Sequence, residues 1–274
     1  MKLLLAGVTF TLISWVFAWG QFSPLSAYTF FPLWLGYILT VNGFSRWLTG
    51  QSLLHRMGSR FILLFLISIP FWWLFEFLNL FTQNWQYLVP GEVSGFSYFI
   101  QASVNFSTVT PAVLSTAFFF SSLLRKIKPL KGKPFAIKKT TPLLLAGLSA
   151  TSFLLILLLP EFSFPLLWAG VVLLFEPLNY LLKFRSLLYE LSRGRLTLPV
   201  SIASAALFTG FWWELWNFYS LPKWTYSVPY VSFYKVFEMP ILGYIGYLPF
   251  GLEIYSFACF SFGILKKLPL LKDI

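Results

Sequence analysis

The sequence predicts an all-α membrane protein with eight transmembrane helices, arranged as two parallel four-helix repeats with both chain ends in the cytoplasm. Three observations support this class: the composition, a repeated motif and the distribution of basic residues. Of the 274 residues, 58% are hydrophobic and only 11% are charged, whereas a soluble domain carries about 25% charged residues. Such a deficit of charge is typical of a chain that lies largely in lipid.

Eight apolar stretches come close to the roughly 20 residues that a helix needs to cross the hydrocarbon of a membrane. Backbone groups inside a membrane must be hydrogen-bonded within the segment, so each stretch is expected to be helical. The second stretch is the weakest because Pro32 and Gly36 interrupt it, but the sixth stretch is its counterpart in a sequence repeat. The expected spans are 2–19, 28–45, 61–82, 96–124, 142–160, 163–183, 199–220 and 240–265.

The repeat is visible in a Trp-x-Tyr-x-Val-Pro motif that occurs twice, at 85–90 and 224–229. Each copy follows a Glu-x-x-Asn on an apolar stretch. These two pairs are Glu76–Asn79 and Glu214–Asn217, and their offset along the chain is one residue shorter than that of the Trp-x-Tyr-x-Val-Pro motif. The chain is therefore expected to be a tandem duplication.

The repeat also predicts how the halves are related. An even number of spans in each repeat gives both the same orientation, about an axis along the membrane normal. Residues 1–125 would form the first four-helix repeat and 142–274 the second, joined by a basic cytoplasmic linker at 126–141. Trp and Tyr prefer the headgroup level and Pro ends a helix. We therefore expect the two Trp-x-Tyr segments to be short interfacial segments on the outer leaflet.

Lys and Arg residues fix the predicted orientation. In the predicted topology, only Lys223 and Lys235 fall on the side of the membrane opposite the two termini. Cytoplasmic loops carry an excess of basic residues, so both termini are expected in the cytoplasm of a bacterial inner membrane. The side of the termini carries Lys2, Arg46, Arg56, Arg60, Arg125, Lys126, Lys128, Lys131, Lys133, Lys138, Lys139, Lys183, Arg185, Arg193, Arg195, Lys266, Lys267 and Lys272.

The net charge of +11 follows from these loops and predicts no nucleic-acid partner. Membrane lipids are the expected partners, and a contact between the basic run at 125–139 and anionic headgroups is one alternative that the sequence leaves open. The sequence predicts no particular protein partner.

No metal or cofactor is expected. The chain has one cysteine, Cys259, and one histidine, His55, so it lacks the clusters that bind zinc, haem or iron–sulfur groups. The only aspartate is Asp273, and no phosphate-binding loop or HExxH motif is present. Magnesium held by carboxylates and substrate phosphates remains an open alternative.

Acidic and amide side chains inside the predicted spans mark a candidate site. Charged residues in a bilayer are rare because they are costly. Glu76 and Glu214 are the candidate catalytic acids, and Glu176 is assigned neither a functional nor a structural role. The candidate ligand-binding residues are Asn79, Asn217, Gln101, Asn105, Glu238, Glu253, Trp85, Tyr87, Trp224 and Tyr226.

Three stretches, 71–79, 106–111 and 237–250, resemble motifs of an uncharacterised family of duplicated bacterial polytopic membrane proteins. This resemblance covers much of both repeats and implies no particular activity.

A second resemblance concerns the layout of residues 211–253. An aromatic span, a Trp-x-Tyr loop and a Glu/Pro motif that opens the next span are similar to the small membrane lycopene cyclases. In those proteins intramembrane carboxylates are thought to protonate the polyene. Their paired Glu-Glu after Pro is absent here, because Glu238 precedes Pro240 and the next acid is Glu253.

These residues predict an outward-facing, mostly apolar cavity that handles a lipid or an isoprenoid-like amphiphile. As an enzyme, the protein would use a protonated Glu76 or Glu214 as general acid, oriented by Asn79 or Asn217. As a carrier, it would use the same groups to bind a headgroup or to couple to protons. The alternative is a non-catalytic scaffold or assembly subunit, whose acids only hold the helices together by hydrogen bonds.

Overall fold

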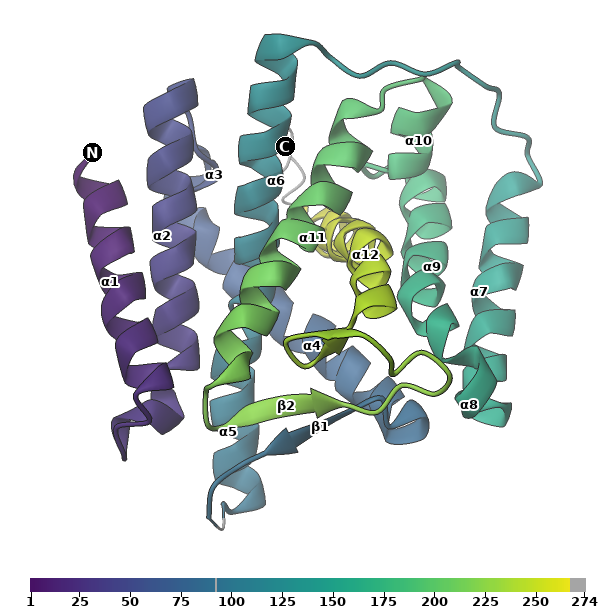
Figure 1. The fold of residues 1–274 in the computed structure, drawn as a ribbon. Helices are drawn as coiled ribbons and strands as arrows, with labels where there is room; N and C mark the ends of the chain where they lie inside the picture. Colours follow the sequence, from purple (N-terminus) through teal and green to yellow (C-terminus); the bar gives the residue numbers. More distant parts are fainter. Residues whose placement is uncertain (92, 267–274) are drawn as a thin grey trace.

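The computed structural model describes residues 1–91 and 93–266, so the predicted basic residues Lys267 and Lys272 lie outside the described part. The described chain is almost entirely helical (Figure 1). Its α-helices are α1 (Lys2–Trp19), α2 (Phe30–Thr49), α3 (Leu53–Met57), α4 (Ile62–Thr82), α5 (Gly95–Phe106), α6 (Val109–Ile127), α7 (Thr141–Leu158), α8 (Pro160–Ser163), α9 (Leu167–Leu181), α10 (Leu187–Ser192), α11 (Thr197–Phe218) and α12 (Tyr247–Ile264).

Short 3-10 segments and strands complete the fold. The 3-10 segments are η1 (Leu25–Tyr28), η2 (Gly58–Phe61), η3 (Phe164–Leu166) and η4 (Ile241–Gly246). The strands are β1 (Trp85–Leu88), β2 (Lys223–Tyr226), β3 (Lys235–Val236) and β4 (Met239–Pro240).

Within the described residues, six helical segments are long and apolar enough to cross a membrane. This supports the predicted class of an all-α, multi-pass membrane protein. The predicted spans 28–45 and 199–220, which correspond to α2 and α11, are not among these six segments. Helix α11 packs against α6 and α12 through small and hydroxyl residues such as Ser201, Ala205 and Thr209. Such residues are typical of helix contacts inside a membrane, and they lower the mean hydropathy of a helix that faces protein more than lipid.

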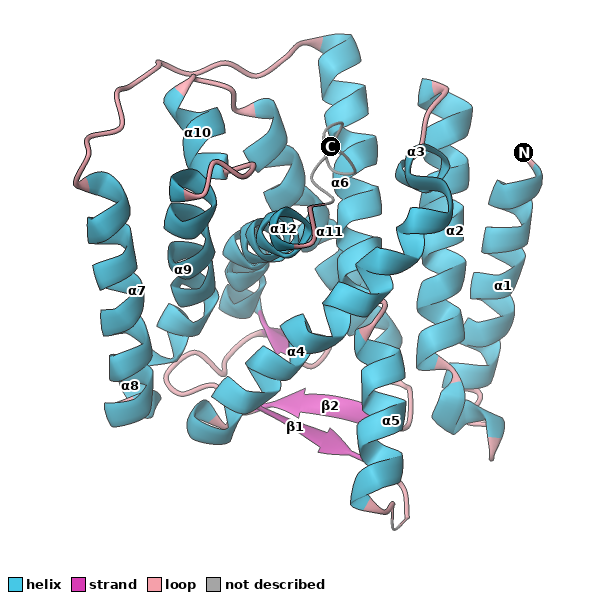
Figure 2. Ribbon diagram, turned by 180° about the vertical axis from the view of Figure 1, so that it is seen from behind, coloured by secondary structure: helices cyan, strands magenta, loops and turns pink. Residues whose placement is uncertain are grey.

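The helices form two flanking pairs around a crossed centre (Figures 1 and 2). Helices α1 and α2 form one flank, and α7 and α9 form the other. Helices α4, α6, α11 and α12 lie between these pairs. The β1–β2 pair lies at one end of the bundle, and the linker between α6 and α7 lies at the other end.

Glycine residues allow α1 and α2 to approach closely. A Cβ atom at Gly36 would lie 2.6 Å from the backbone nitrogen of Thr11. A Cβ atom at Gly43 would lie 2.6 Å from the Cα atom of Leu4. Since backbone atoms cannot move aside as a flexible side chain can, these positions exclude larger residues.

The fourth and eighth predicted spans, 96–124 and 240–265, coincide with candidate membrane-spanning segments, but neither is one continuous α-helix. The first divides into α5 and α6, and in the second η4 precedes α12. Pro111 and Pro249 each occupy the third position of the following helix. Pro is tolerated in a first turn, but in a continuous helix its ring would clash with the carbonyl one turn earlier. Helices α6 and α12 begin at Val109 and Tyr247, with the same offset along the chain as the Glu-x-x-Asn pairs.

The two Trp-x-Tyr segments pair with each other, which the sequence did not predict. They form the antiparallel pair β1–β2, in which Trp85 lies opposite Tyr226 and Tyr87 lies opposite Trp224. Strand pairing satisfies backbone groups that an isolated extended segment would leave unpaired. The pair connects the two halves of the chain.

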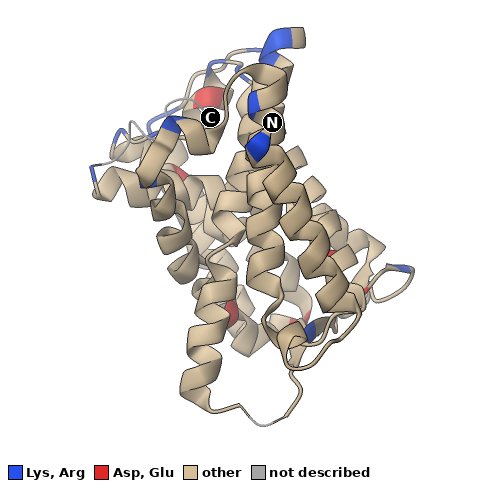
Figure 3. Cartoon of the chain, turned by 90° about the vertical axis from the view of Figure 1, so that its left-hand side faces the viewer, with Lys and Arg blue, Asp and Glu red and all other residues tan. Residues whose placement is uncertain are grey.

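Basic residues gather at the end of the bundle that carries the linker, and few lie at the β1–β2 end (Figure 3). The linker lies against the start of α11. The backbone nitrogen of Leu196 donates to the carbonyl of Leu130 at 3.1 Å, and Gly132 donates to the carbonyl of Gly194 at 2.9 Å.

We expect Gly36→Val to loosen the packing of α1 on α2, because the added side chain would meet the Thr11 backbone. Overpacking of this kind costs about 1–3 kcal/mol, so the apparent Tm of the purified protein should fall by at least about 2 °C. Circular dichroism during heating measures this. Gly147→Val on α7 is the control, since a Cβ atom there meets nothing within 4 Å. Equal melting of both variants would contradict the close α1–α2 contact.

Candidate functional site

The first predicted acid, Glu76 on α4, is bonded to the strand that follows it. Its Oε1 accepts hydrogen bonds from the hydroxyl of Tyr87 at 2.6 Å and the indole nitrogen of Trp85 at 3.1 Å. The indole nitrogen of Trp72, one turn earlier on α4, donates to the same oxygen at 2.8 Å. The carboxyl group therefore fastens β1 to α4.

The second predicted acid, Glu214 on α11, occupies the corresponding place under β2. Its Oε1 accepts hydrogen bonds from the hydroxyls of Tyr226 and Tyr247, each at 2.6 Å. The indole nitrogen of Trp224 donates to the Tyr226 oxygen at 2.8 Å. Glu214 is completely buried, and its Oε2 has no hydrogen-bond partner among the described residues.

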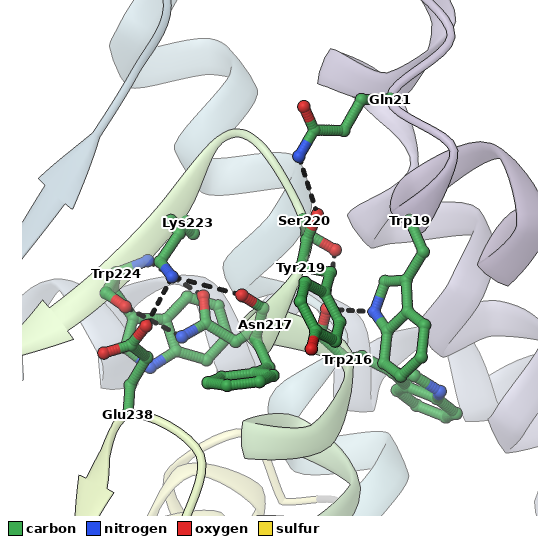
Figure 4. A network of polar contacts seen from close by, with 10 residues as sticks. Trp19, Gln21, Trp216, Asn217, Tyr219, Ser220, Lys223, Trp224 and Glu238 are labelled. Carbon is green, nitrogen blue, oxygen red and sulfur yellow. Dashed lines mark hydrogen bonds and ion pairs between the residues drawn. The ribbon is translucent and has the colours of Figure 1, made fainter.

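The paired asparagines hold the strand backbones. Asn79 donates from Nδ2 to the carbonyl of Trp85 at 2.9 Å, and its Oδ1 accepts from the backbone nitrogen of Asn84 at 2.8 Å. Asn217 donates to the carbonyl of Trp224 at 2.7 Å and accepts from its backbone nitrogen at 2.9 Å (Figure 4). Each Glu-x-x-Asn pair thus fixes one strand by its side chains and by its backbone.

Both strand tyrosines remain hydrogen-bond donors at neutral pH. Burial, and then the negative charge of Glu76, raises the pKa of Tyr87 well above its ordinary value. Burial, and then Glu214, raises the pKa of Tyr226 in the same way. The phenols therefore stay protonated, and each donates to a carboxyl oxygen.

A cavity of about 110 Å³ lies between the β1–β2 pair and the central helices. We call it the aromatic chamber, because most of its wall consists of aromatic rings. The rings of Trp72 and Trp213, from the two halves of the chain, lie 5.2 Å apart between centroids. Other wall residues are Trp85, Tyr87, Trp168, Trp224, Tyr226 and Phe250. Glu76 and Glu214 lie behind this wall and do not line the chamber.

Asn105 on α5 supplies an amide to the wall of the aromatic chamber. Among the hydrogen bonds of the described residues, those at Asn105 use its backbone carbonyl and none uses its side chain. Gly243, its counterpart at the offset of the Glu-x-x-Asn pairs, lines the same chamber. Gln101, predicted with Asn105, instead donates to the carbonyl of Ala27 at 2.8 Å and serves the packing of α5.

An ion pair lies at the edge of the aromatic chamber. Lys223 lines the chamber, and its Nζ donates to the carboxylate of Glu238 (Figure 4). The same nitrogen donates to the carbonyl of Phe218 at 3.1 Å. The predicted site residue Glu238 thus lies close to the cavity, bonded to a cation.

The other two acids lie away from the aromatic chamber. Glu253 on α12 is completely buried, and neither of its oxygens has a hydrogen-bond partner among the described residues. Glu176 on α9 accepts from the hydroxyls of Ser256 at 2.6 Å and Ser186 at 2.8 Å, and from the backbone nitrogen of Leu188 at 2.9 Å. These bonds give Glu176 a structural role, because they hold the start of α10 against α9 and α12.

Sequence reasoning missed several residues of the chamber wall: Trp72, Trp168, Trp213, Tyr247 and Lys223. The doublets Trp72-Trp73 and Trp212-Trp213 were a signal, but a tryptophan in an apolar helix is equally compatible with simple packing. In the described part of the chain, no group of three or more His, Cys, Asp or Glu residues could hold a metal ion.

Comparison of this chain with family models, with curated proteins and with solved structures finds no match. The function proposed below therefore rests on the geometry of the site.

We expect Glu214→Leu to destabilise the protein, because it leaves the buried hydroxyls of Tyr226 and Tyr247 without an acceptor. Each unsatisfied buried group costs about 1–3 kcal/mol. Thermal unfolding of the purified protein should show a clearly lowered Tm. Glu161→Leu is the control, since Glu161 is exposed and, among the described residues, its side chain accepts a single long bond of 3.4 Å from Tyr230. The hydrogen-bond scheme is wrong if the two variants melt together.

Proposed function

We propose that this chain is an integral membrane protein that binds a lipid or an isoprenoid-like amphiphile in the aromatic chamber. The observation that carries the proposal is the Asn105 carboxamide, which lines a mostly aromatic chamber and has no side-chain hydrogen bond among the described residues. Ligand sites typically combine an apolar wall with a few polar groups that orient the ligand. Here the wall would take an apolar chain, and Asn105 would bond to its polar group.

The aromatic wall of the chamber disfavours the binding of a small hydrophilic solute. Such a solute would lose its bonds to water and regain few from indole and phenyl rings, which is costly for each unpaired polar group. An amphiphile places its apolar part against the rings. Its polar part could lie near the Lys223–Glu238 pair at the edge of the chamber.

The proposal also covers how many helices cross the membrane and in which direction. We propose eight transmembrane helices in two parallel repeats, at 1–125 and 142–274, in a bacterial inner membrane. Support comes from the equal offset of α6 and α12 and from the gathering of basic residues at the linker end (Figure 3). Both termini would then be cytoplasmic, and the aromatic chamber would face outward.

We favour a binding or carrier protein over an enzyme that uses Glu76 or Glu214 directly. In both acids Oε1 already accepts two or more hydrogen bonds, and neither acid lines the chamber. A general acid must come within hydrogen-bond reach of the atom that it protonates. In this arrangement Tyr87 and Tyr226 stand between the acids and a bound molecule.

One observation favours the second candidate, a non-catalytic scaffold or assembly subunit. The Glu-x-x-Asn side chains form their hydrogen bonds with the β1–β2 pair, which joins the two halves of the chain. Interhelical hydrogen bonds of this kind stabilise membrane proteins without any ligand. Ligand retention by the chamber separates the two candidates.

We expect Gly243→Phe to abolish retention of a co-purified ligand. The new ring would enter the chamber, where its nearest neighbour is the flexible side chain of Met239. Native mass spectrometry with lipid extraction measures this, and retention should fall at least about tenfold, or about 1.4 kcal/mol. Gly95→Phe is the control, because a Cβ atom at Gly95 meets nothing within 4 Å. Retention of the same species by the Gly243 variant would refute the chamber as its site and favour the scaffold.

A second set of variants separates binding from acid chemistry. Asn105→Leu removes the free amide and should weaken ligand retention about tenfold, the effect of one hydrogen bond. The double variant Glu76→Gln/Glu214→Gln should retain the ligand, because each glutamine oxygen can still accept from the tyrosines. The opposite pattern, loss in a folded double variant and retention by Asn105→Leu, would show that the acids themselves form the ligand site.

A further inference from the structure

A second concave surface lies between helices α1, α2, α6 and α11. We call it the lateral groove; it has a volume of about 310 Å³ and shares no lining residue with the aromatic chamber. Its wall is almost wholly apolar, and exposed residues such as Leu12 and Phe208 lie along it. Representative wall residues are Val8, Trp15, Val41, Phe44, Phe119 and Trp212.

The lateral groove is closed at the end nearer β1–β2. There the rings of Trp15 and Trp216 lie 6.0 Å apart, and Trp212 lies 5.4 Å from Trp216. The indole nitrogen of Trp19 donates to the carbonyl of Trp216 at 3.2 Å, which holds the end of α1 against α11 (Figure 4). Towards the linker end α11 diverges from α2 (Figure 1). A molecule in the groove would therefore extend towards the basic end of the bundle.

The length and the apolar wall of the lateral groove fit one hydrocarbon chain. Along α1 it runs from Val8 to Trp15, a rise of about 10 Å. A single acyl chain is narrow enough to enter.

A cation lies beyond the open end of the lateral groove. Lys126 follows the groove residue Phe119 by two helical turns, so it lies on nearly the same face of α6, about 10 Å nearer the linker. Lys126 is exposed, donates to the carbonyl of Leu48 at 3.3 Å, and has no acidic partner among the described residues. Further lysines follow in the linker. Basic residues at a membrane surface attract anionic headgroups.

We propose that the lateral groove binds one acyl chain of an anionic phospholipid, from the leaflet on the side of the linker, with the lipid phosphate held by Lys126. The chain enters from the basic end and ends against Trp15, Trp212 and Trp216. The shape, the apolar wall and the position of the charge all match this one occupant. The site is separate from the aromatic chamber and does not depend on the function proposed for it.

Native mass spectrometry tests the site with delipidated full-length protein and two probes, dioleoyl phosphatidylglycerol and dioleoyl phosphatidylcholine. We expect one phosphatidylglycerol to be retained at least about tenfold more tightly than phosphatidylcholine. Val8→Trp fills the groove and should reduce this retention about tenfold. Leu5→Trp is the matched control, because Leu5 is exposed on the same helix and does not line the groove. Equal retention by these two variants overturns the groove as the site.

The charge is tested on the surface of the protein, where a substitution does not disturb packing. Lys126→Gln should abolish the preference for phosphatidylglycerol over phosphatidylcholine, and Lys138→Gln in the linker should preserve it. Equal loss in both variants would mean a diffuse electrostatic attraction and would overturn the assignment to Lys126. Gly243→Phe in the aromatic chamber should leave phosphatidylglycerol binding unchanged, so failure of this proposal and failure of the chamber proposal are distinguishable.

Discussion

The fold around the aromatic chamber depends on two carboxyl groups, that of the buried Glu214 and that of the half-buried Glu76, which each accept hydrogen bonds from the strand above them. Glu76 bonds to Tyr87 and Glu214 bonds to Tyr226, at 2.6 Å in both cases. The tyrosine hydroxyls replace bonds to water that these carboxyl groups lose inside the protein, so they favour the position of each strand in which its tyrosine can donate. Because β1 and β2 also pair with each other, the two halves of the chain are joined at this end of the bundle.

The two halves of the chain differ where they line the aromatic chamber. Pro111 and Pro249 end the preceding segment in both halves, so α6 and α12 begin at matching positions. Before that point the halves differ, since the first has helix α5 and the second has η4. Asn105 therefore comes from a helix and Gly243 from a 3-10 turn, yet both line the chamber. An amide on one side and a glycine without a side chain on the other suit an asymmetric ligand better than a symmetric pair of identical contacts.

The two apolar concavities differ in how they could recognise a lipid. The aromatic chamber has rigid rings with an amide, Asn105, in the wall, which favours selection by shape and by a hydrogen bond. In the wall of the lateral groove, the hydroxyls of Thr11 and Thr40 donate to backbone carbonyls of their own helices, and the cation proposed to hold a headgroup is Lys126. Recognition there would come from headgroup charge, which is sensitive to salt, and from general burial of a chain.

Much of the helical framework could be predicted from the sequence, because each of the eight apolar stretches contains a helix and composition alone indicates a membrane protein. The Glu-x-x-Asn pairs could also be singled out, since three-residue spacing puts both side chains on one helix face. The duplication and the membrane orientation remain predictions. Pairing of β1 with β2 could not be foreseen, because it joins segments from opposite halves of the chain, such as Leu88 with Lys223. The placement of Glu76 and Glu214 behind the chamber wall, and of Trp72 and Trp213 in it, was decided only by tertiary structure, because periodicity gives the face of a helix but not the neighbour that it meets.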